Sequence, residues 1–204
     1  MRQSGAARIG TLSDYRTQEQ YGEHVADPHE GTKLLAGTIE DLNFESAKKY
    51  PGLQGLIDVS GGGKIRNLQV DKFTSSITDA LLFSTSQEYS ERLHNEWLAT
   101  EGYDTCYRIL SARLFFKALS DELAPDYQFV GFANVVYAEE IDIATPLAGI
   151  HPALVKRNPR HSVQSEVRAI WQPSANRELT PLILPKSRAN LYCVHHSSLG
   201  QDGA

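Results

Sequence analysis

The 204-residue sequence has little of what marks a secreted or membrane-bound protein. It contains two cysteines, Cys106 and Cys193, which are too few for a disulfide framework. Both lie in apolar, strand-like stretches, so we expect small buried thiols rather than catalytic or metal-binding ones. No apolar run approaches the length of a membrane span, and no signal-peptide-like stretch opens the chain. We therefore expect a cytoplasmic protein without a membrane partner.

Several familiar catalytic signatures are also missing. The seven histidines are scattered, and none belongs to an HExxH or Cys-x-x-Cys unit, so we expect no metal site. Three consecutive glycines at 61–63 lack the spacing and the hydroxyl of a phosphate-binding loop, and they predict a flexible turn between two strands. The stretch "LFSTSQEY" (82–89) lacks the glycines of the nucleophile elbow of serine hydrolases.

The composition is ordinary for a globular protein, with 41% hydrophobic and 22% charged residues. The length is enough to bury a core but too short for two comfortable domains, so we expect one domain over 1–204 with a disordered tail at 197–204. The net charge of −5 gives no global attraction to nucleic acid. The stretch "KRNPRHS" (156–162) is nevertheless locally basic.

Local patterns predict more strands than helices, without regular alternation of the two. Strands are expected at 6–12, 32–45, 80–86, 103–110, 127–140, 163–171, 178–185 and 190–196. Helices are expected at 13–23, 87–102 and 111–124. This order predicts an α+β fold with a mainly antiparallel sheet and flanking helices.

The stretch "QSEVRAIW" (164–171) carries two different rows of side chains. If it is extended, alternation puts Trp171 and smaller apolar residues on one face, and Gln164, Glu166 and Arg168 on the other. The apolar row explains how the strand is anchored. The polar row has two interpretations, a solvated face whose charges pair across the sheet, or side chains with a chemical role.

Two earlier segments also combine a strand-like run with polar side chains. "RIGTL" (8–12) has an Arg followed by a Gly and a hydroxyl residue. "LFSTS" (82–86) delivers Ser84, Thr85 and Ser86 to the end of an apolar strand. Ser86 is also well placed to cap the helix that is expected after it.

The order of these segments resembles the Arg-Ser-Glu class of ADP-ribosyltransferases. That class has an Arg near the start, an aromatic-Ser-Thr-Ser strand end in the middle, and a Gln-x-Glu or Glu-x-Glu pair at a later strand. "GTLSDYR…DPHEG", "LFSTS…NEW" and "VKRNPRHSVQSEVRAIW" also resemble a bacterial family of unknown function with Asp-Pro-x-Glu-Gly and Glu-x-Arg motifs. Together the resemblances touch most of residues 8–171, and they imply a split sheet around an NAD-binding cleft.

The resemblance implies a role for individual residues. Glu166 would stabilise the sugar cation that forms as nicotinamide leaves NAD, a cation like that of glycoside hydrolysis. Gln164 would orient the acceptor group, and Ser84 would brace Glu166 and the ribose. The implied NAD contacts are Arg8, Gly10, Thr11, Arg16, Thr85 and Ser86. Arg8 and Arg16 stay alternatives for the phosphates, since an arginine fork suits bidentate binding of anions.

The activity implied by the resemblance is NAD-dependent mono-ADP-ribosyl transfer to a protein or nucleic acid, by a bacterial toxin or antiphage effector. NAD is then the substrate, and the partners are a macromolecular acceptor and an optional inhibitor protein. One alternative is an NAD glycohydrolase, in which water is the acceptor. Another is a non-catalytic module that binds nucleic acid or a protein, because the basic stretch 156–162 stands where the resemblance predicts an aromatic acceptor loop.

Overall fold

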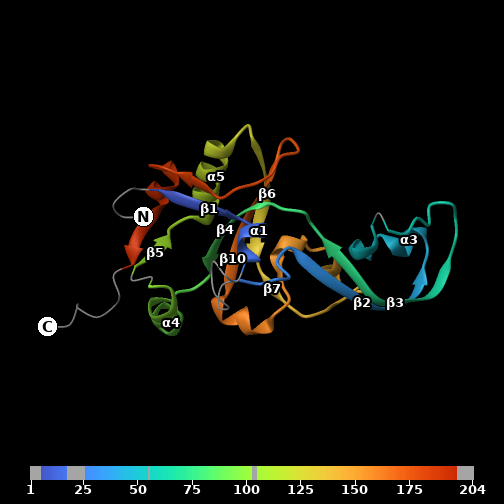
Figure 1. Cartoon of the computed structure of the whole chain (residues 1–204). Coiled ribbons are helices and arrows are strands. Elements are labelled where there is room, and N and C mark those ends of the chain that lie inside the picture. Colours follow the sequence, from blue (N-terminus) through green and yellow to red (C-terminus); the bar gives the residue numbers. More distant parts are fainter. Residues whose placement is uncertain (1–5, 18–25, 55, 103–104, 197–204) are drawn as a thin grey trace. The chain divides into compact units, whose positions relative to one another are not determined.

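The computed structural model describes residues 6–17, 26–54, 56–102 and 105–196 (Figure 1). The fold is α+β with antiparallel sheets and few helices, as the sequence predicts. Its residues divide into two compact units, which are considered separately. Unit 1 comprises Met1–Thr11, Leu81–Phe132 and Val163–Ala204, and unit 2 comprises Leu12–Ala80 and Ala133–Ser162. The expected tail at 197–204 lies outside the described residues, and the expectation of one domain stays a prediction.

Unit 1 is built on a five-stranded sheet with the strand order β11-β1-β4-β10-β6. The strands are β1 (Ala7–Thr11), β4 (Leu81–Ser86), β6 (Tyr127–Asn134), β10 (Glu166–Pro173) and β11 (Leu182–Leu184). β4 lies between β1 and β10 and pairs antiparallel with both (Figure 1). Because successive side chains of a strand point to opposite sides, this register sorts the side chains of all three strands into two faces.

One face of the sheet forms the core of unit 1 against α5 (Ala112–Leu123). Phe115 and Phe116 of α5 are buried against the fully buried Trp171 of β10 and its neighbours. The Trp171 indole donates a hydrogen bond to Ser120 Oγ at 2.9 Å, which satisfies its polar atom. The apolar row that alternation predicts in β10 is therefore confirmed at Trp171.

The helix α4 (Glu91–Glu101) begins four residues later than predicted. Ser90 caps it, since the Ser90 side chain accepts a hydrogen bond from Leu93 N. Ser86 is still part of β4, so the prediction that Ser86 caps this helix is wrong. The predicted end at Gly102 is confirmed, because Gly102 adopts a left-handed conformation with φ of 71°.

A separate two-stranded sheet of unit 1 joins β5 (Cys106–Ile109) to β12 (Cys193–His196). The strand predicted at 190–196 starts instead as the 3-10 helix η5 (Arg188–Tyr192), which the Ser187 side chain caps. The strand predicted at 178–185 is reduced to β11. This shortening occurs beside Pro181 and Pro185, which lack the N–H needed for a continuous ladder.

Unit 2 contains a three-stranded sheet with the order β3-β2-β8, formed by β2 (Thr32–Leu42), β3 (Ile65–Ser76) and β8 (Ile141–Asp142). β2 and β3 form a long antiparallel hairpin, and the glycines 61–63 lie in an open turn before β3. The short elements are α1 (Leu12–Tyr15), α3 (Phe44–Ala47), η1 (Pro51–Leu53), β7 (Val136–Tyr137), η2 (Pro146–Gly149), η3 (Pro152–Leu154), β9 (Val155–Lys156) and η4 (Pro159–Gln164). The last of these extends into unit 1.

The helix predicted at 13–23 is confirmed only as α1. Ser13 lies inside α1, and its backbone N donates to Asp79 Oδ1 at 3.1 Å, so Ser13 is not the N-cap. The part of that prediction at 18–23 falls outside the described residues. No helix within the described ranges is both long enough and apolar enough to cross a membrane.

Candidate functional site

Three of the predicted segments lie on neighbouring strands of unit 1. The register of β4 and β10 sets Ser84 opposite Arg168 and Ser86 opposite Glu166. Residues that face each other in an antiparallel pair point to the same side of the sheet. These four side chains therefore share the side away from the Trp171 core.

β1 adds two further predicted residues to this side. Gly10 pairs with Leu82, which lies two residues before Ser84 along β4. Arg8 lies two residues before Gly10 and so points to the same side. The strand partner of Arg8 is Ile183 of β11. We call this side the polar face and define it by its polar and charged residues, Arg8, Ser84, Ser86, Glu166 and Arg168.

Two of the expected NAD contacts on these strands face the other side of the sheet. Thr11 pairs with Leu81, and Thr85 pairs with Val167, so both belong to the side that packs against α5. Leu81 is part of the buried core cluster. The register thus brings together Arg8, Gly10, Ser84, Ser86 and Glu166, but not Thr11 or Thr85.

Gln164 lies outside the strand, and the prediction of an extended segment from Gln164 onward is wrong. Gln164 is the last residue of η4, and Ser165 adopts a positive φ of 42°, which interrupts the alternation. Ser165 O accepts a hydrogen bond from Gln87 N at 2.7 Å. The Gln164 side chain is buried, with 7% of the residue exposed. Strand alternation therefore does not align Gln164 with Glu166.

Glu166 and Arg168 form a buried ion pair along one strand. Only 6% of Glu166 and 1% of Arg168 are exposed, so the interpretation as a solvated face is wrong. Arg168 Nε donates to Glu166 Oε1 at 2.5 Å, and a terminal guanidinium nitrogen of Arg168 donates to Oε2 at 3.3 Å. Such a two-point contact fixes the plane of the carboxylate as well as its distance. This ion pair joins residues two apart on one strand.

Ser84 carries an unsatisfied polar atom at the centre of the polar face. Its Oγ is buried and has no hydrogen-bond partner among the residues that the structure describes. An unpaired buried hydroxyl lowers stability unless another group satisfies it, and such groups often mark functional positions. The hydroxyl can donate one hydrogen bond and accept others. Ser84 therefore has free capacity for a ligand directly opposite the ion pair.

Arg16, the alternative phosphate ligand, belongs to unit 2, where its guanidinium donates hydrogen bonds to backbone carbonyl groups. Its Nε donates to Glu30 O at 2.8 Å, and its two terminal nitrogens donate to Thr78 O and Ile77 O, each at 3.3 Å. These contacts tie the end of α1 to the Asp-Pro-x-Glu-Gly segment and to the end of β3. Arg16 thus has a sufficient structural role in its own unit.

The Asp-Pro-x-Glu-Gly segment (27–31) itself forms a turn. Asp27 Oδ1 accepts a hydrogen bond from His29 N at 2.9 Å, and Asp27 O accepts one from Glu30 N at the same distance. Gly31 closes the turn with φ of 74° and lies so close to Leu12 that a Cβ would meet its side chain at 2.9 Å. The glycine is therefore needed for both conformation and space.

Lys33 and His151 are two interacting titratable residues of unit 2, the first buried and the second half-buried. Lys33 Nζ donates to Ala148 O at 2.5 Å and to Ile150 O at 2.7 Å. Burial lowers the pKa of Lys33. Burial, together with the Lys33 charge, lowers the pKa of His151, whose Nδ1 accepts a hydrogen bond from Ala153 N. These contacts are explained by packing, and neither residue was predicted as a site.

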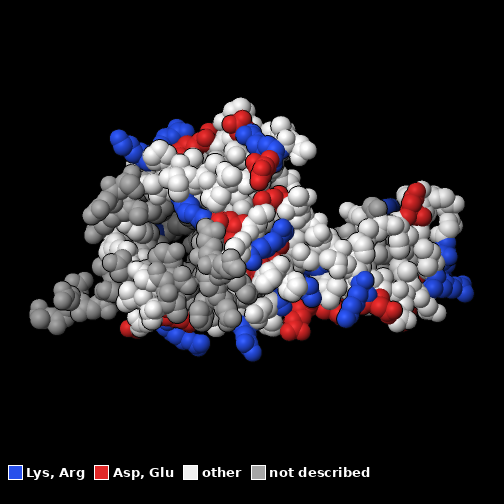
Figure 2. All heavy atoms as spheres, in the orientation of Figure 1, with Lys and Arg blue, Asp and Glu red and all other residues white. Residues whose placement is uncertain are grey.

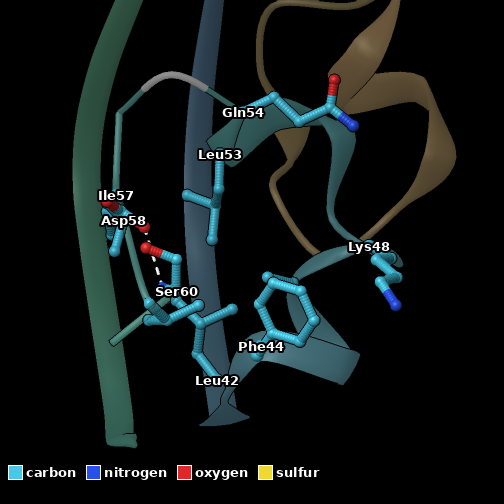
Figure 3. Close-up of a pocket in the computed structure, with 10 residues that line it drawn as sticks. Leu42, Phe44, Lys48, Leu53, Gln54, Ile57, Asp58 and Ser60 are labelled. Atoms are coloured by element: carbon cyan, nitrogen blue, oxygen red, sulfur yellow. Dashed lines mark hydrogen bonds between the residues drawn. The ribbon is translucent and has the colours of Figure 1, made fainter. Parts of the chain in front are cut away.

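A small pocket in unit 2 was missed by the sequence analysis (Figure 3). Leu42, Leu53 and the Phe44 ring lie around it, and Asp58 and Ser60 are hydrogen-bonded to each other at its side (Figure 3). It is formed by the irregular segment between β2 and β3, which carries little periodicity that could have revealed it. None of the predicted site residues lines it.

The remaining chemical candidates have ordinary structural explanations. Burial raises the pKa of both the Cys106 and the Cys193 thiols, which disfavours the reactive thiolate. In the ranges that the structure describes, no group of three or more His, Cys, Asp or Glu residues comes together to hold a metal ion.

Charges of both signs are interspersed on the face of the molecule that Figure 2 shows. In the basic stretch 156–162, Lys156 is only 3% exposed, whereas Arg160 is exposed.

Comparison with protein-family models, with curated proteins and with solved structures finds no match to this chain.

Proposed function

We propose that this chain is an NAD-dependent mono-ADP-ribosyltransferase whose NAD site is the polar face of unit 1. One observation carries the proposal: Arg8, Ser84 and Glu166 lie on the neighbouring strands β1, β4 and β10 and share one side of the sheet. These residues are far apart in the sequence, and their types match the Arg-Ser-Glu order. The proposed setting is a toxin or antiphage effector that modifies a macromolecule in a bacterial cytoplasm.

The chemistry of the polar face suits cleavage of the bond between nicotinamide and ribose. As this bond breaks, positive charge develops on the ribose, and the Glu166 carboxylate would stabilise it. Burial of Glu166 strengthens that interaction because the surroundings screen charge less than water does. Ser84 Oγ has the free hydrogen-bonding capacity to hold a ribose hydroxyl, and Arg8 would bind the phosphates. The Gly10 backbone would permit close approach of the nicotinamide amide.

A second candidate activity is NAD glycohydrolysis, which differs only in the acceptor. The burial of Gln164 at the end of η4 favours it, because a buried amide is poorly placed to guide a macromolecular acceptor. Water can reach a site that a protein or nucleic acid cannot. Free ADP-ribose without labelled macromolecule would identify this activity.

The non-catalytic nucleic-acid module has less support. Lys156 is buried, and the visible surface carries interspersed charges rather than a basic stripe (Figure 2). A salt-sensitive complex with a polyanion, combined with no stabilisation by NAD, would favour this alternative.

The direct test is to mix the purified chain with labelled NAD and a bacterial cell extract. We expect release of nicotinamide and label on a macromolecule. Glu166→Gln should lower the rate by about 100-fold or more, because it removes the charge that stabilises the transition state. Glu178→Gln, which alters an exposed carboxylate of unit 1, is the matched control and should leave the rate unchanged. No transfer and no nicotinamide release at high protein concentration would overturn the proposal.

A further inference from the structure

Arg168 is the most deeply buried charged side chain of the polar face, and the resemblance gives it no role. We propose that Arg168 is a positioning residue, which holds the Glu166 carboxylate in one orientation for the reaction. This inference rests on the proposed function, since it concerns how the same site works. The inference goes beyond the proposed function because it names a residue that orients the Glu166 carboxylate without touching NAD.

The contact between the two side chains is suited to that task. Both carboxylate oxygens of Glu166 accept hydrogen bonds from the Arg168 guanidinium, so rotation of the carboxylate is restricted. A lysine could supply the charge at one point but not the planar fork. Because both residues belong to the same strand, two apart, the backbone of β10 fixes their relative position.

A purely structural role would leave two features unexplained. Buried ion pairs are weak sources of stability, and apolar residues of similar volume often replace them without loss. The same row of β10 continues with buried Ile170, so an apolar side chain is compatible with this side of the strand. In addition, Ser84, directly opposite Arg168, has an unsatisfied hydroxyl where a structural network would be complete.

The role of Arg168 follows from the steps of the reaction. The bond between the ribose carbon and the nicotinamide nitrogen breaks, and its electron pair leaves with neutral nicotinamide. A lone pair of the acceptor then forms the new bond to the ribose carbon, and the acceptor proton passes to solvent. Arg168 gives up no proton, because a guanidinium stays protonated. It keeps the Glu166 carboxylate aimed at the charge that develops on the ribose, so its loss should act on kcat more than on KM.

The test is steady-state kinetics of nicotinamide release with Arg168→Lys and Arg168→Met. We expect kcat to fall about tenfold for Arg168→Lys and about 100-fold for Arg168→Met, while KM changes less than about threefold. Arg113→Lys, an exposed arginine of α5, is the matched control and should match the unmodified chain. Arg168→Lys retains the charge, so it decides the question alone if Arg168→Met does not fold.

The double variant Glu166→Gln/Arg168→Lys separates positioning from general support of the fold. If Arg168 acts through Glu166, the double variant should be no slower than Glu166→Gln alone. Arg168→Lys with an unchanged kcat, or a double variant slowed by the full additional factor, would overturn the inference and leave the proposed function standing. An unmodified chain that releases no nicotinamide would overturn the proposed function and the inference with it.

Discussion

The two units bury a cation in different ways. In unit 2, Lys33 donates to the backbone carbonyls of Ala148 and Ile150, so the cation satisfies groups that the fold must satisfy anyway. In unit 1, Arg168 is paired with a second buried charge, Glu166, and stands opposite the unpartnered hydroxyl of Ser84. The first arrangement is complete as structure, whereas the second has unused hydrogen-bonding capacity.

This difference identifies which buried polar group is a candidate for function. Arg16 behaves like Lys33, because its guanidinium also donates to backbone carbonyls within unit 2. A carboxylate partner, in contrast, adds the desolvation of a second charge. The pair of unit 1 therefore calls for an explanation outside stability, and the following experiments probe that contrast.

The largest effect on stability is expected from breaking the ion pair. Glu166→Leu or Arg168→Met alone should lower the free energy of unfolding by about 3–5 kcal/mol, because each removes the opposite charge from a buried charged side chain. The double variant Glu166→Leu/Arg168→Met should recover most of that loss. Urea unfolding followed by circular dichroism measures all three. A double variant as unstable as the singles would show that the fold itself requires the pair.

A smaller loss of stability is expected from removing the two hydrogen bonds that Lys33 donates. Lys33→Met leaves two carbonyls without their donor, and should lower the free energy of unfolding by about 2 kcal/mol. Lys72→Met, at an exposed position of β3, serves as the control and should change little. Equal stability of the two variants in the same urea titration would mean that the hydrogen bonds of Lys33 contribute nothing to the free energy of unfolding.

The effect of pH through His151 should be smaller again. The pKa of His151 is lowered in the fold, so below the ordinary value of about 6.5 the unfolded chain binds a proton that the folded chain does not. The free energy of unfolding should therefore fall as pH decreases through that value, until the folded ring also protonates. His151→Gln should flatten this part of the profile, because Gln does not titrate. Identical profiles for both proteins between pH 7 and pH 5 would contradict this expectation.

Ser84→Ala should not lower the stability of the fold. Its Oγ is buried and makes no hydrogen bond among the described residues, so we expect the free energy of unfolding to stay unchanged or to rise by up to about 1 kcal/mol. Ser120→Ala is the matched comparison, since it removes the acceptor of the Trp171 indole and should lose about 1 kcal/mol. Under the proposed function, Ser84→Ala lowers the rate of nicotinamide release and Ser120→Ala does not. The reverse pattern would make Ser84 an ordinary core residue.

How far the sequence predicts this site can be judged on β10. Its apolar row was predictable, because alternation depends only on local backbone geometry. Its start was not, because the positive φ of Ser165 goes with the 3-10 helix η4 and a hydrogen bond from distant Gln87. The burial of Glu166 and Arg168 was also missed, since a polar row gives no local sign of what covers it.

The shared side of Arg8, Ser84 and Glu166 depends on strand order and register, which a single sequence does not encode locally. The same limit separates Ser84 from Thr85. Both stand in one hydroxyl-rich segment, yet the register sends their side chains to opposite sides of the sheet. Only a resemblance could therefore connect the three segments in advance.

The most direct measurement is to map NAD binding by backbone amide chemical shifts in solution. The account predicts shifts in β1, β4 and β10, centred on Gly10, Ser84 and Glu166, and none around Lys33 in unit 2. Glu166→Gln should retain that pattern, because the polar face would still bind NAD. No shifts at saturating NAD, or shifts confined to unit 2, would contradict the assignment of function to the polar face.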